Sequence, residues 1–232
     1  MTAPLFDLAP RPVVPVKGSD RGFPINRIFC VGRNYAAHAA EMGVEVDREA
    51  PFYFTKSAAH TVMSGAAVPY PPGTDNYHFE MEFAVAIGAP AFRVAPGDAM
   101  AAVFGYCCAL DMTRRDLQIK ERNIKRPWDL GKDVEGSAVV APITRAAEFG
   151  AIDAQTIWLD QNGTRVQKST LDLLIHSVPA VIAHLSGFYH LVPGDLILTG
   201  TPEGVGPVAP ADVLAGGVTG LDPIGLTITA PT

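Results

Sequence analysis

The stretch NYHFEMEFAVAIG, residues 76–88, restricts the fold most, because it places two carboxylates inside an otherwise apolar run. In a strand, residues i and i+2 project from the same face, so Glu80 and Glu82 are expected to point the same way. Ala84 and Ala86 continue that face, and the alternate positions 79, 81, 83 and 85 carry Phe, Met, Phe and Val. Both faces are therefore expected to be buried.

Two ionised carboxylates on one face of a buried strand repel each other, so either one pKa rises or a cation binds between them. A divalent cation with oxygen ligands would compensate the charge, whereas on a solvated edge strand Glu80 and Glu82 would need no partner. His78 shares their face and is a candidate to contact the ligands of such a cation. Asp111, in GYCCALDMTRRDLQ, ends a second apolar run. It would complete an oxygen ligand set or cap a helix, and the residues alone leave both interpretations open.

Short strands outnumber helices along the rest of the chain. Asn162-Gly163, between two alternating runs, predicts a type I′ hairpin. Helices are expected from an Asn34 cap to Gly43, over about residues 113–122, and from Ser177 and Pro179 to about Phe188. Further strands are expected at RIFCV, PFYFTK, 103–111, DLILTG and GLTITA. The pattern predicts one α+β domain at residues 21–232, after an extended, proline-rich arm at residues 1–20.

Charge and cysteine usage exclude several classes of protein. The formal net charge is −6, whereas a nucleic-acid partner would require a face rich in Lys and Arg. Cys30, Cys107 and Cys108 are odd in number and lack metal-binding spacing, so they are expected to be reduced and buried. The longest uncharged apolar stretch, residues 99–110, is shorter than the about 20 residues that cross a bilayer. We expect a cytoplasmic protein without a membrane partner that acts on a small molecule.

Two further motifs carry candidate chemistry. In RNYAAHAAEM, His38 and Glu41 lie three apart on the expected helix, so they share a face and can hydrogen-bond. A carboxylate that orients an imidazole favours proton removal from water near neutral pH, although surface neighbours of this kind are also common. TGTPEGVG is rich in glycine but lacks the lysine and the spacing of a phosphate loop. Its backbone amides and the Thr201 hydroxyl are expected to hold a carboxylate instead.

Four motifs in one order resemble those of the fumarylacetoacetate hydrolase family, from residue 22 onward: HFEMEFAVAIG (78–88), GYCCALDMTRRDLQ (105–118), RPWDLGKDVEGSAVVAPI (126–143) and GDLILTGTPEGVG (194–206). The resemblance implies a strand-rich α+β fold, a mixed β-sandwich roll with short peripheral helices. It implies Mg²⁺, with Mn²⁺ as the alternative ion, bound by Glu80, Glu82 and Asp111. It also implies that His38 and Glu41, on a lid segment, activate water.

The resemblance assigns further residues to the substrate. Lys132, in WDLGKDVEG, would polarise the carbonyl of the substrate, although an exposed turn lysine is the alternative. Arg115 and Gln118 follow Asp111 by four and seven positions and would contact carboxylate and oxo oxygens. Lys56 departs from the family pattern, because Lys-Ser rather than Lys-Pro follows the PFYF run.

The reaction that the resemblance implies is hydrolysis of a carbon–carbon bond in an acylpyruvate. Residues 23–43 and 125–143 are most similar to family members that split fumarylpyruvate into fumarate and pyruvate during aromatic (gentisate) degradation. Arg33, Arg126 or Lys56 would then hold the distal carboxylate. Oxaloacetate decarboxylation and isomerisation or decarboxylation of a dioate stay open as alternatives, as does a dicarboxylate-binding protein without turnover. The family generally forms dimers, so a homodimer is expected.

Overall fold

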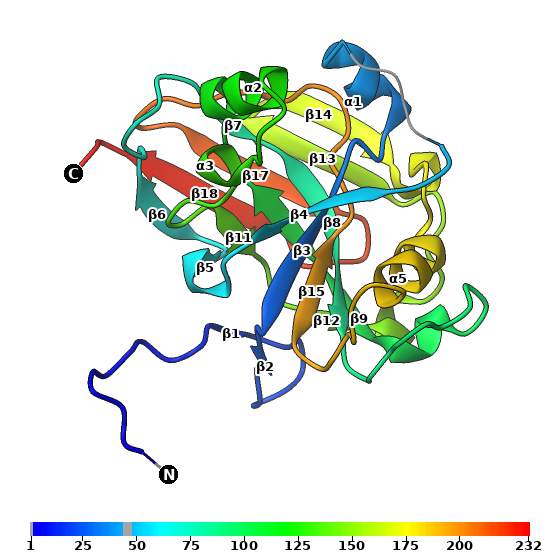
Figure 1. Ribbon diagram of the computed structural model, residues 1–232. Helices are drawn as coiled ribbons and strands as arrows, with labels where there is room; N and C mark the ends of the chain where they lie inside the picture. The colour runs from blue at the N-terminus through cyan, green and yellow to red at the C-terminus, as the bar shows by residue number, and fades with distance from the viewer. Residues whose placement is uncertain (1, 44–47) are drawn as a thin grey trace.

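The largest element of the structure is an eight-stranded mixed sheet (Figure 1). The structure is a computed structural model that describes residues 2–43 and 48–232; Met1 of the predicted arm and residues 44–47 of the predicted domain lie outside the described residues. Seven strands follow one another in the order β4 (Phe52–Lys56), β3 (Arg27–Gly32), β15 (Asp195–Leu198), β8 (Met81–Ile87), β9 (Val103–Asp111), β11 (Ala138–Val140) and β5 (Thr61–Met63). The eighth, β12 (Thr144–Arg145), pairs with β9.

A five-stranded sheet covers one face of the large sheet. Its order is β14 (Thr164–Thr170), β13 (Thr156–Gln161), β17 (Val213–Val218), β18 (Ile224–Thr229) and β6 (Ala66–Pro69). Asn162 and Gly163 join β13 to β14 with φ values of 53° and 80°, and a type I′ turn requires both to be positive. The predicted hairpin is confirmed.

Strand β8 is buried along its whole length, as its composition predicts. Phe83 and Val85 on one face join a core cluster with Ile157 and Leu214 of the five-stranded sheet. The alternate residues Ala84 and Ala86 contribute to a second cluster on the other face, where the small side chains of Cys107, Ala109 and Ala138 also lie. The three cysteines are free and buried, as expected, and burial raises the pKa of each thiol, which disfavours the reactive thiolate.

Helices and small sheets lie at the margin of the large sheet. The helices are α1 (Ala36–Glu41), α2 (Arg115–Asn123), α3 (Asp129–Lys132), α4 (Ala146–Phe149) and α5 (Val178–Ser186), with short 3-10 turns at Ala58–His60, Ala99–Ala102 and Leu171–Leu173. A three-stranded sheet has the order β10 (Thr113–Arg114), β7 (Tyr77–Phe79), β16 (Gly206–Pro207), and β1 (Val13–Val14) pairs with β2 (Phe23–Pro24).

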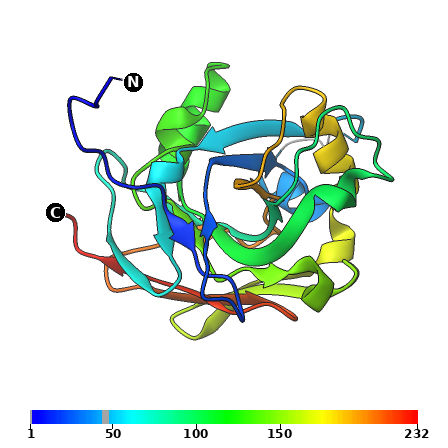
Figure 2. The same ribbon diagram turned by 90° about the horizontal axis from the view of Figure 1, so that it is seen from below.

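The large sheet curls round on itself, and the five-stranded sheet lies along one side of the roll (Figure 2). α1, α2 and α3 gather at one end of the roll, and β1 and β2 lie toward the opposite end (Figure 1). The predicted α+β roll with short peripheral helices is confirmed. Among the described residues, no helix has the length and apolarity that crossing a bilayer requires.

Two local predictions were wrong. The strand expected over 79–88 breaks at Glu80, because β7 leaves to pair with β10 and β16 while β8 stays in the large sheet. Asn34 does not cap α1, whose N-cap is Tyr35. The Asn34 amide instead donates to the carbonyl oxygens of Thr199 (2.9 Å) and His176 (3.0 Å) and accepts from the His176 N–H (2.7 Å). These tertiary partners replace the local cap and tie the start of α1 to the segment after β15.

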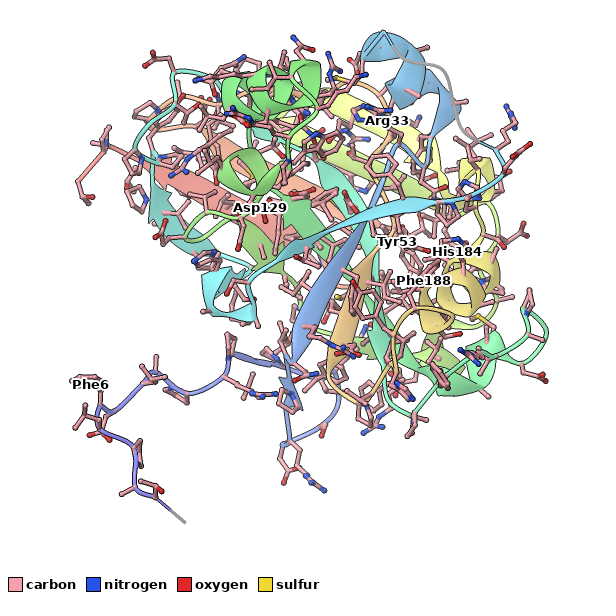
Figure 3. All side chains as sticks on the ribbon, viewed as in Figure 1. Phe6, Arg33, Tyr53, Asp129, His184 and Phe188 are labelled. Carbon is pink, nitrogen blue, oxygen red and sulfur yellow. The ribbon has the colours of Figure 1, made fainter. Side chains whose placement is uncertain are left out.

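Only the first part of the predicted N-terminal arm extends away from the domain. Residues 2–11 are exposed, and Phe6 lies well away from the body of the molecule (Figure 3). From Val13 the chain pairs with β2, and Val14 and Val16 are buried in the second core cluster. The extended arm therefore ends near residue 12 rather than residue 20.

Candidate metal centre and active site

Three carboxylates converge at the end of the roll where α1, α2 and α3 lie. Glu82 projects from β8 on the face of Ala84, and Asp111 ends the neighbouring strand β9. The Asp111 N–H donates to the Glu80 carbonyl oxygen at 2.9 Å, which fixes the strand break beside Asp111. One oxygen from each of the three side chains lies within 4.8 Å of the others, and all three residues are buried. The predicted convergence is present.

Lys132 and Arg115 neutralise part of this negative charge. The Lys132 ammonium, from α3, donates to Glu80 Oε2 (2.8 Å), Asp111 Oδ2 (2.7 Å) and Thr113 Oγ1 (2.8 Å), and Arg115 pairs with Glu80 Oε1. Burial alone would raise the pKa of Glu80, but Lys132 and Arg115 outweigh it and hold that pKa well below its usual range. Burial likewise opposes the charge of Lys132, but Asp111 and Glu80 raise its pKa. Both groups are therefore charged near neutral pH.

Glu82 has the opposite environment. Burial, then Asp111 and Glu80, raise its pKa well above the usual value, although the Gly200 N–H donates to Glu82 Oε2 at 2.6 Å. A glycine is needed at position 200, because its φ is +102° and an added Cβ would lie 2.8 Å from Asn34 Cβ. Without a further positive charge, Glu82 is expected to hold a proton.

Lys56 lies behind the triad and is not free to bind a substrate. Its ammonium pairs with Asp111 Oδ1 at 2.9 Å and donates to the carbonyl oxygens of Met112 (3.0 Å) and Lys132 and to Ser137 Oγ (2.8 Å). The side chain is fully buried. The expectation that Lys56 holds a distal carboxylate is therefore wrong, because its side chain joins the segments that carry Asp111 and Lys132.

The donor set fits a hard divalent cation. Asp111 Oδ1 is buried and accepts no well-directed hydrogen bond from the part of the chain that the structure describes, since Lys56 lies close to it but off the hydrogen-bonding direction. Glu82 Oε1 accepts no hydrogen bond from the described residues, although its partner oxygen does. Carboxylate oxygens are the ligands that Mg²⁺ and Mn²⁺ prefer. Glu80, Glu82 and Asp111 could each supply one oxygen to a single ion.

His38 and Glu41 form the expected pair on α1. His38 Nδ1 lies 3.3 Å from Glu41 Oε2, and the Gly204 N–H donates to both oxygens of Glu41 at 3.2 Å. Burial is the largest influence on His38 and lowers its pKa, with Arg115 acting the same way and Glu80 acting against it. His38 lines the same pocket as Glu80 and Glu82. The imidazole is therefore expected to be neutral and able to accept a proton at neutral pH.

Two backbone amides of the Gly-rich loop hold carboxylates of the protein itself. Its Gly200 N–H donates to Glu82 and its Gly204 N–H donates to Glu41. These two amides already have partners and are not free to bind a substrate carboxylate, so the predicted contact stays a prediction for the other amides of the loop and for Thr201. The Thr201 side chain remains among the pocket-lining groups.

All four residues expected to contact the substrate line this pocket, namely Arg33, Arg115, Gln118 and Thr201. Arg115 and Gln118 also hydrogen-bond to each other. Arg33 has a left-handed backbone (φ 56°), and its guanidinium lies 5.3 Å from the Phe52 ring and 5.7 Å from the Trp128 ring, at the same end of the molecule as α1 (Figure 3). Arg126 instead lines an adjoining cavity of about 580 Å³ that shares Arg33 and Trp128.

Several residues at this site were not predicted from the sequence. Arg122, Trp128 and Phe54 line the pocket, and none stands in a pattern that marks it as functional. Gln167, on β14, is buried and hydrogen-bonds to Met81 N–H and to Thr201. The only signal for Gln167 was an uncharged polar residue in an alternating strand.

His78 supports Arg115 rather than the triad directly. Its Nε2 lies 2.8 Å from Asn76 Oδ1, and its Nδ1 accepts a long hydrogen bond from Arg115 Nε at 3.5 Å. Burial, followed by the charge of Arg115, lowers the pKa of His78 to about 4, so it stays neutral. His60 and His184 pair elsewhere, with Asp133 and Tyr53.

Comparison with known proteins agrees with this geometry. Residues 27–228 match the family described as fumarylacetoacetate (FAA) hydrolase, C-terminal. A fumarylpyruvate hydrolase from Ralstonia sp. is 50% identical over 189 residues, which are 81% of this chain and 98% of that protein. A mitochondrial oxaloacetate tautomerase from Oryza sativa subsp. japonica is 38% identical over 197 residues, 84% of this chain and 87% of that protein.

Solved structures include the same kind of relative. The crystal structure of fumarylpyruvate hydrolase from Pseudomonas aeruginosa, in complex with Mn²⁺ and pyruvate, superposes with a TM-score of 0.94 at 41% identity. The match covers 98% of this chain and all of that chain. The likeness therefore extends over both sheets and the candidate site.

Proposed function

The chain belongs to the fumarylacetoacetate hydrolase family, and from this premise we propose that it is a metal-dependent enzyme that hydrolyses fumarylpyruvate to fumarate and pyruvate. The observation that carries the proposal is one pocket lined by Glu80 and Glu82, beside Asp111, and by the neutral His38 that Glu41 orients. The relatives from Ralstonia sp. and Pseudomonas aeruginosa support the choice of substrate.

Glu80, Glu82 and Asp111 would hold Mg²⁺ or Mn²⁺, which when bound would act as a Lewis acid toward the 2-oxo group of the substrate. The charge of the surrounding protein suits an anionic ligand. The three carboxylates face three basic side chains, Lys56, Lys132 and Arg115, so their charges balance. A bound dication then leaves an excess of positive charge, to which Arg33 and Arg122 in the same pocket add, and this excess suits a dianion such as fumarylpyruvate.

His38 supplies the base. With its Nδ1–H donated to Glu41, the Nε2 lone pair is available to accept a proton from water. The hydroxide equivalent adds to the distal carbonyl carbon, and the bond between that carbon and the methylene of the pyruvyl group breaks. The oxygen of water ends in the new fumarate carboxylate, and a proton delivered to the methylene gives the methyl group of pyruvate.

Lys132 and the substrate-binding residues orient the oxo acid. Lys132 stays protonated and lines the pocket, so it favours negative charge on the oxo oxygen as the carbon–carbon bond breaks. Thr201, Gln118 and Arg115 surround the same space and would bind the carboxylate next to the 2-oxo group.

Arg33 and Arg122 would hold the distal carboxylate. Both line the pocket, and the pKa of Arg33 is lowered first by burial and then by the nearby charge of Arg122. Two like charges that disfavour each other would be stabilised by an anion between them. We therefore expect Arg33→Met and Arg122→Met to weaken cleavage of fumarylpyruvate more than that of acetylpyruvate, which has no distal carboxylate.

Oxaloacetate tautomerisation is the second candidate, because a tautomerase is 38% identical. It would use the same oxo-acid site and a proton transfer by His38 without attack by water. The test is incubation of the Mg²⁺-loaded protein with fumarylpyruvate and, separately, with enol-oxaloacetate, while absorbance in the near ultraviolet is followed. Loss of fumarylpyruvate with formation of pyruvate supports the hydrolase. Conversion of oxaloacetate alone, or binding of a dicarboxylate without turnover, would refute it. The homodimer and the cytoplasmic location stay predictions.

A further inference from the structure

Gln167 is a buried amide that links three segments around the pocket. Its Oε1 accepts from the Met81 N–H at 3.0 Å, between the two glutamates of the triad. Its Nε2 donates to Thr201 Oγ1 at 3.0 Å and to the Pro202 carbonyl oxygen at 2.9 Å. The residue is 1% exposed, so water does not compete for these bonds.

These partners fix the direction of the amide. A backbone N–H can only donate and a backbone carbonyl oxygen can only accept, so Gln167 cannot be turned over without losing both Met81 and Pro202. The Nε2–H₂ group therefore faces Thr201, and the Thr201 oxygen must accept from it.

The hydroxyl proton of Thr201 must then point elsewhere. Among the described residues, the one hydrogen bond of the Thr201 side chain is the one it accepts from Gln167. Thr201 is buried, and it lines the pocket together with His38 and Lys132. A buried hydroxyl without an acceptor is unfavourable, so a ligand oxygen in the pocket would be its natural partner.

We propose that Gln167 is a positioning residue that holds the Thr201 hydroxyl as a hydrogen-bond donor to the carboxylate of the bound 2-oxo acid. The identity of this ligand rests on the proposed function. By occupying a lone pair of the Thr201 oxygen, the amide favours orientations of the hydroxyl that direct its proton into the pocket. A carboxylate, which only accepts hydrogen bonds, meets a donor there.

The competing explanation is purely structural. Gln167 would then only join β14 to Met81 and to the Gly-rich loop, and its replacement would disturb the metal site and the pocket whether or not Thr201 carried a hydroxyl. A double-mutant cycle separates the two explanations, because only a contact that acts through Thr201 disappears when the hydroxyl is absent.

The experiment measures binding of Mn²⁺, and then of pyruvate to the Mn²⁺-loaded protein, by calorimetry. The variants are Thr201→Val, Gln167→Glu and the double variant, with Thr201→Ser and Gln155→Glu as controls. Gln167→Glu keeps an acceptor for the Met81 N–H but puts a second acceptor opposite Thr201, which turns the hydroxyl proton away from the pocket. Among the described residues, the Gln155 side chain bonds only within its own loop, accepting from Asp153 N–H and donating to the Ala151 carbonyl oxygen.

We expect Thr201→Val and Gln167→Glu each to weaken pyruvate binding about 10-fold to 100-fold, the range of a hydrogen bond to a charged group. The double variant should be no weaker than the weaker single variant, and Mn²⁺ affinity should be unchanged. Thr201→Ser, which keeps a hydroxyl, should bind pyruvate more tightly than Thr201→Val, and the control Gln155→Glu should bind it as the unaltered protein does.

Three results would overturn the inference while leaving the hydrolase intact: no effect of Thr201→Val, additive effects in the double variant, or equal loss of Mn²⁺ affinity in Gln167→Glu. If Gln167→Glu does not fold, the same cycle with Gln167→Met applies the same criterion of additivity. An unaltered protein that binds Mn²⁺ but neither binds pyruvate nor cleaves fumarylpyruvate would refute the proposed function together with this inference.

Discussion

Replacement of Lys56 by methionine should destabilise the protein strongly although Lys56 touches no ligand. Methionine keeps the apolar stem but removes the ammonium that pairs with Asp111 at 2.9 Å and donates to Met112 O, Lys132 O and Ser137 Oγ. Two carbonyl oxygens and one carboxylate are then left buried without this donor. Breaking a buried ion pair by removing one partner costs about 3–5 kcal/mol. That is a large part of the roughly 5–15 kcal/mol by which domains are stable.

The assay is thermal unfolding of the metal-free protein followed by circular dichroism. For a chain of this size, each kcal/mol lowers Tm by about 2–4 °C, so Lys56→Met should lower it by about 6–20 °C. Lys168→Met is the matched control, because Lys168 is exposed on β14 and its replacement should change stability by no more than about 0.5 kcal/mol. A fall in Tm for Lys56→Met no larger than that of Lys168→Met would refute the stabilising role of Lys56.

Three further predictions concern the site. His38→Ala should lower fumarylpyruvate hydrolysis about 10²-fold to 10⁴-fold with Mn²⁺ affinity unchanged, and a parallel loss of metal in titration calorimetry would mean that His38 is a ligand. Because burial lowers the pKa of His38 from 6.5, the acid limb of kcat/KM should lie below that pH. Glu41→Gln should move the limb lower still, since the Glu41 hydrogen bond raises this pKa; a limb above pH 6.5 would contradict the assignment. The pKa of Glu82 is raised in the metal-free folded protein, so Glu82 keeps its proton there at a pH at which the unfolded chain has lost it. The contribution of Glu82 to the free energy of unfolding therefore falls as the pH rises above 4.5 toward the folded-state pKa. Mg²⁺ displaces that proton, so the Tm increase produced by saturating Mg²⁺ should grow with pH, and it should not grow in Glu82→Gln.

Sequence patterns predicted the features that depend on local geometry. The two-residue period of β8 put Glu82 and Ala84 on one face, and Asn162-Gly163 specified its hairpin because both residues tolerate positive φ. The three-residue spacing of His38 and Glu41 likewise placed them on one face of α1. In each case the residues concerned are close in the chain, so their spacing determines how they lie relative to each other.

Features that depend on distant partners could not be predicted in the same way. Asparagine is a common helix cap, but the Asn34 side chain hydrogen-bonds to Thr199 and His176, about 140 or more residues later in the chain. The strand is interrupted at Glu80 because β7 pairs with β10, and no local sequence pattern predicts that pairing. Gln167 acts across two sheets, and its role becomes visible only once β14, β8 and the Gly-rich loop are side by side.

Crystals grown with Mn²⁺ and measured at its absorption edge offer the most direct check on the carboxylate centre. The account predicts a single strong anomalous peak in the pocket, coordinated by one oxygen each of Glu80, Glu82 and Asp111, and no such peak in crystals of Glu82→Gln at the same Mn²⁺ concentration. A peak elsewhere in the molecule, or a fully active enzyme whose crystals show none at these residues, would contradict it.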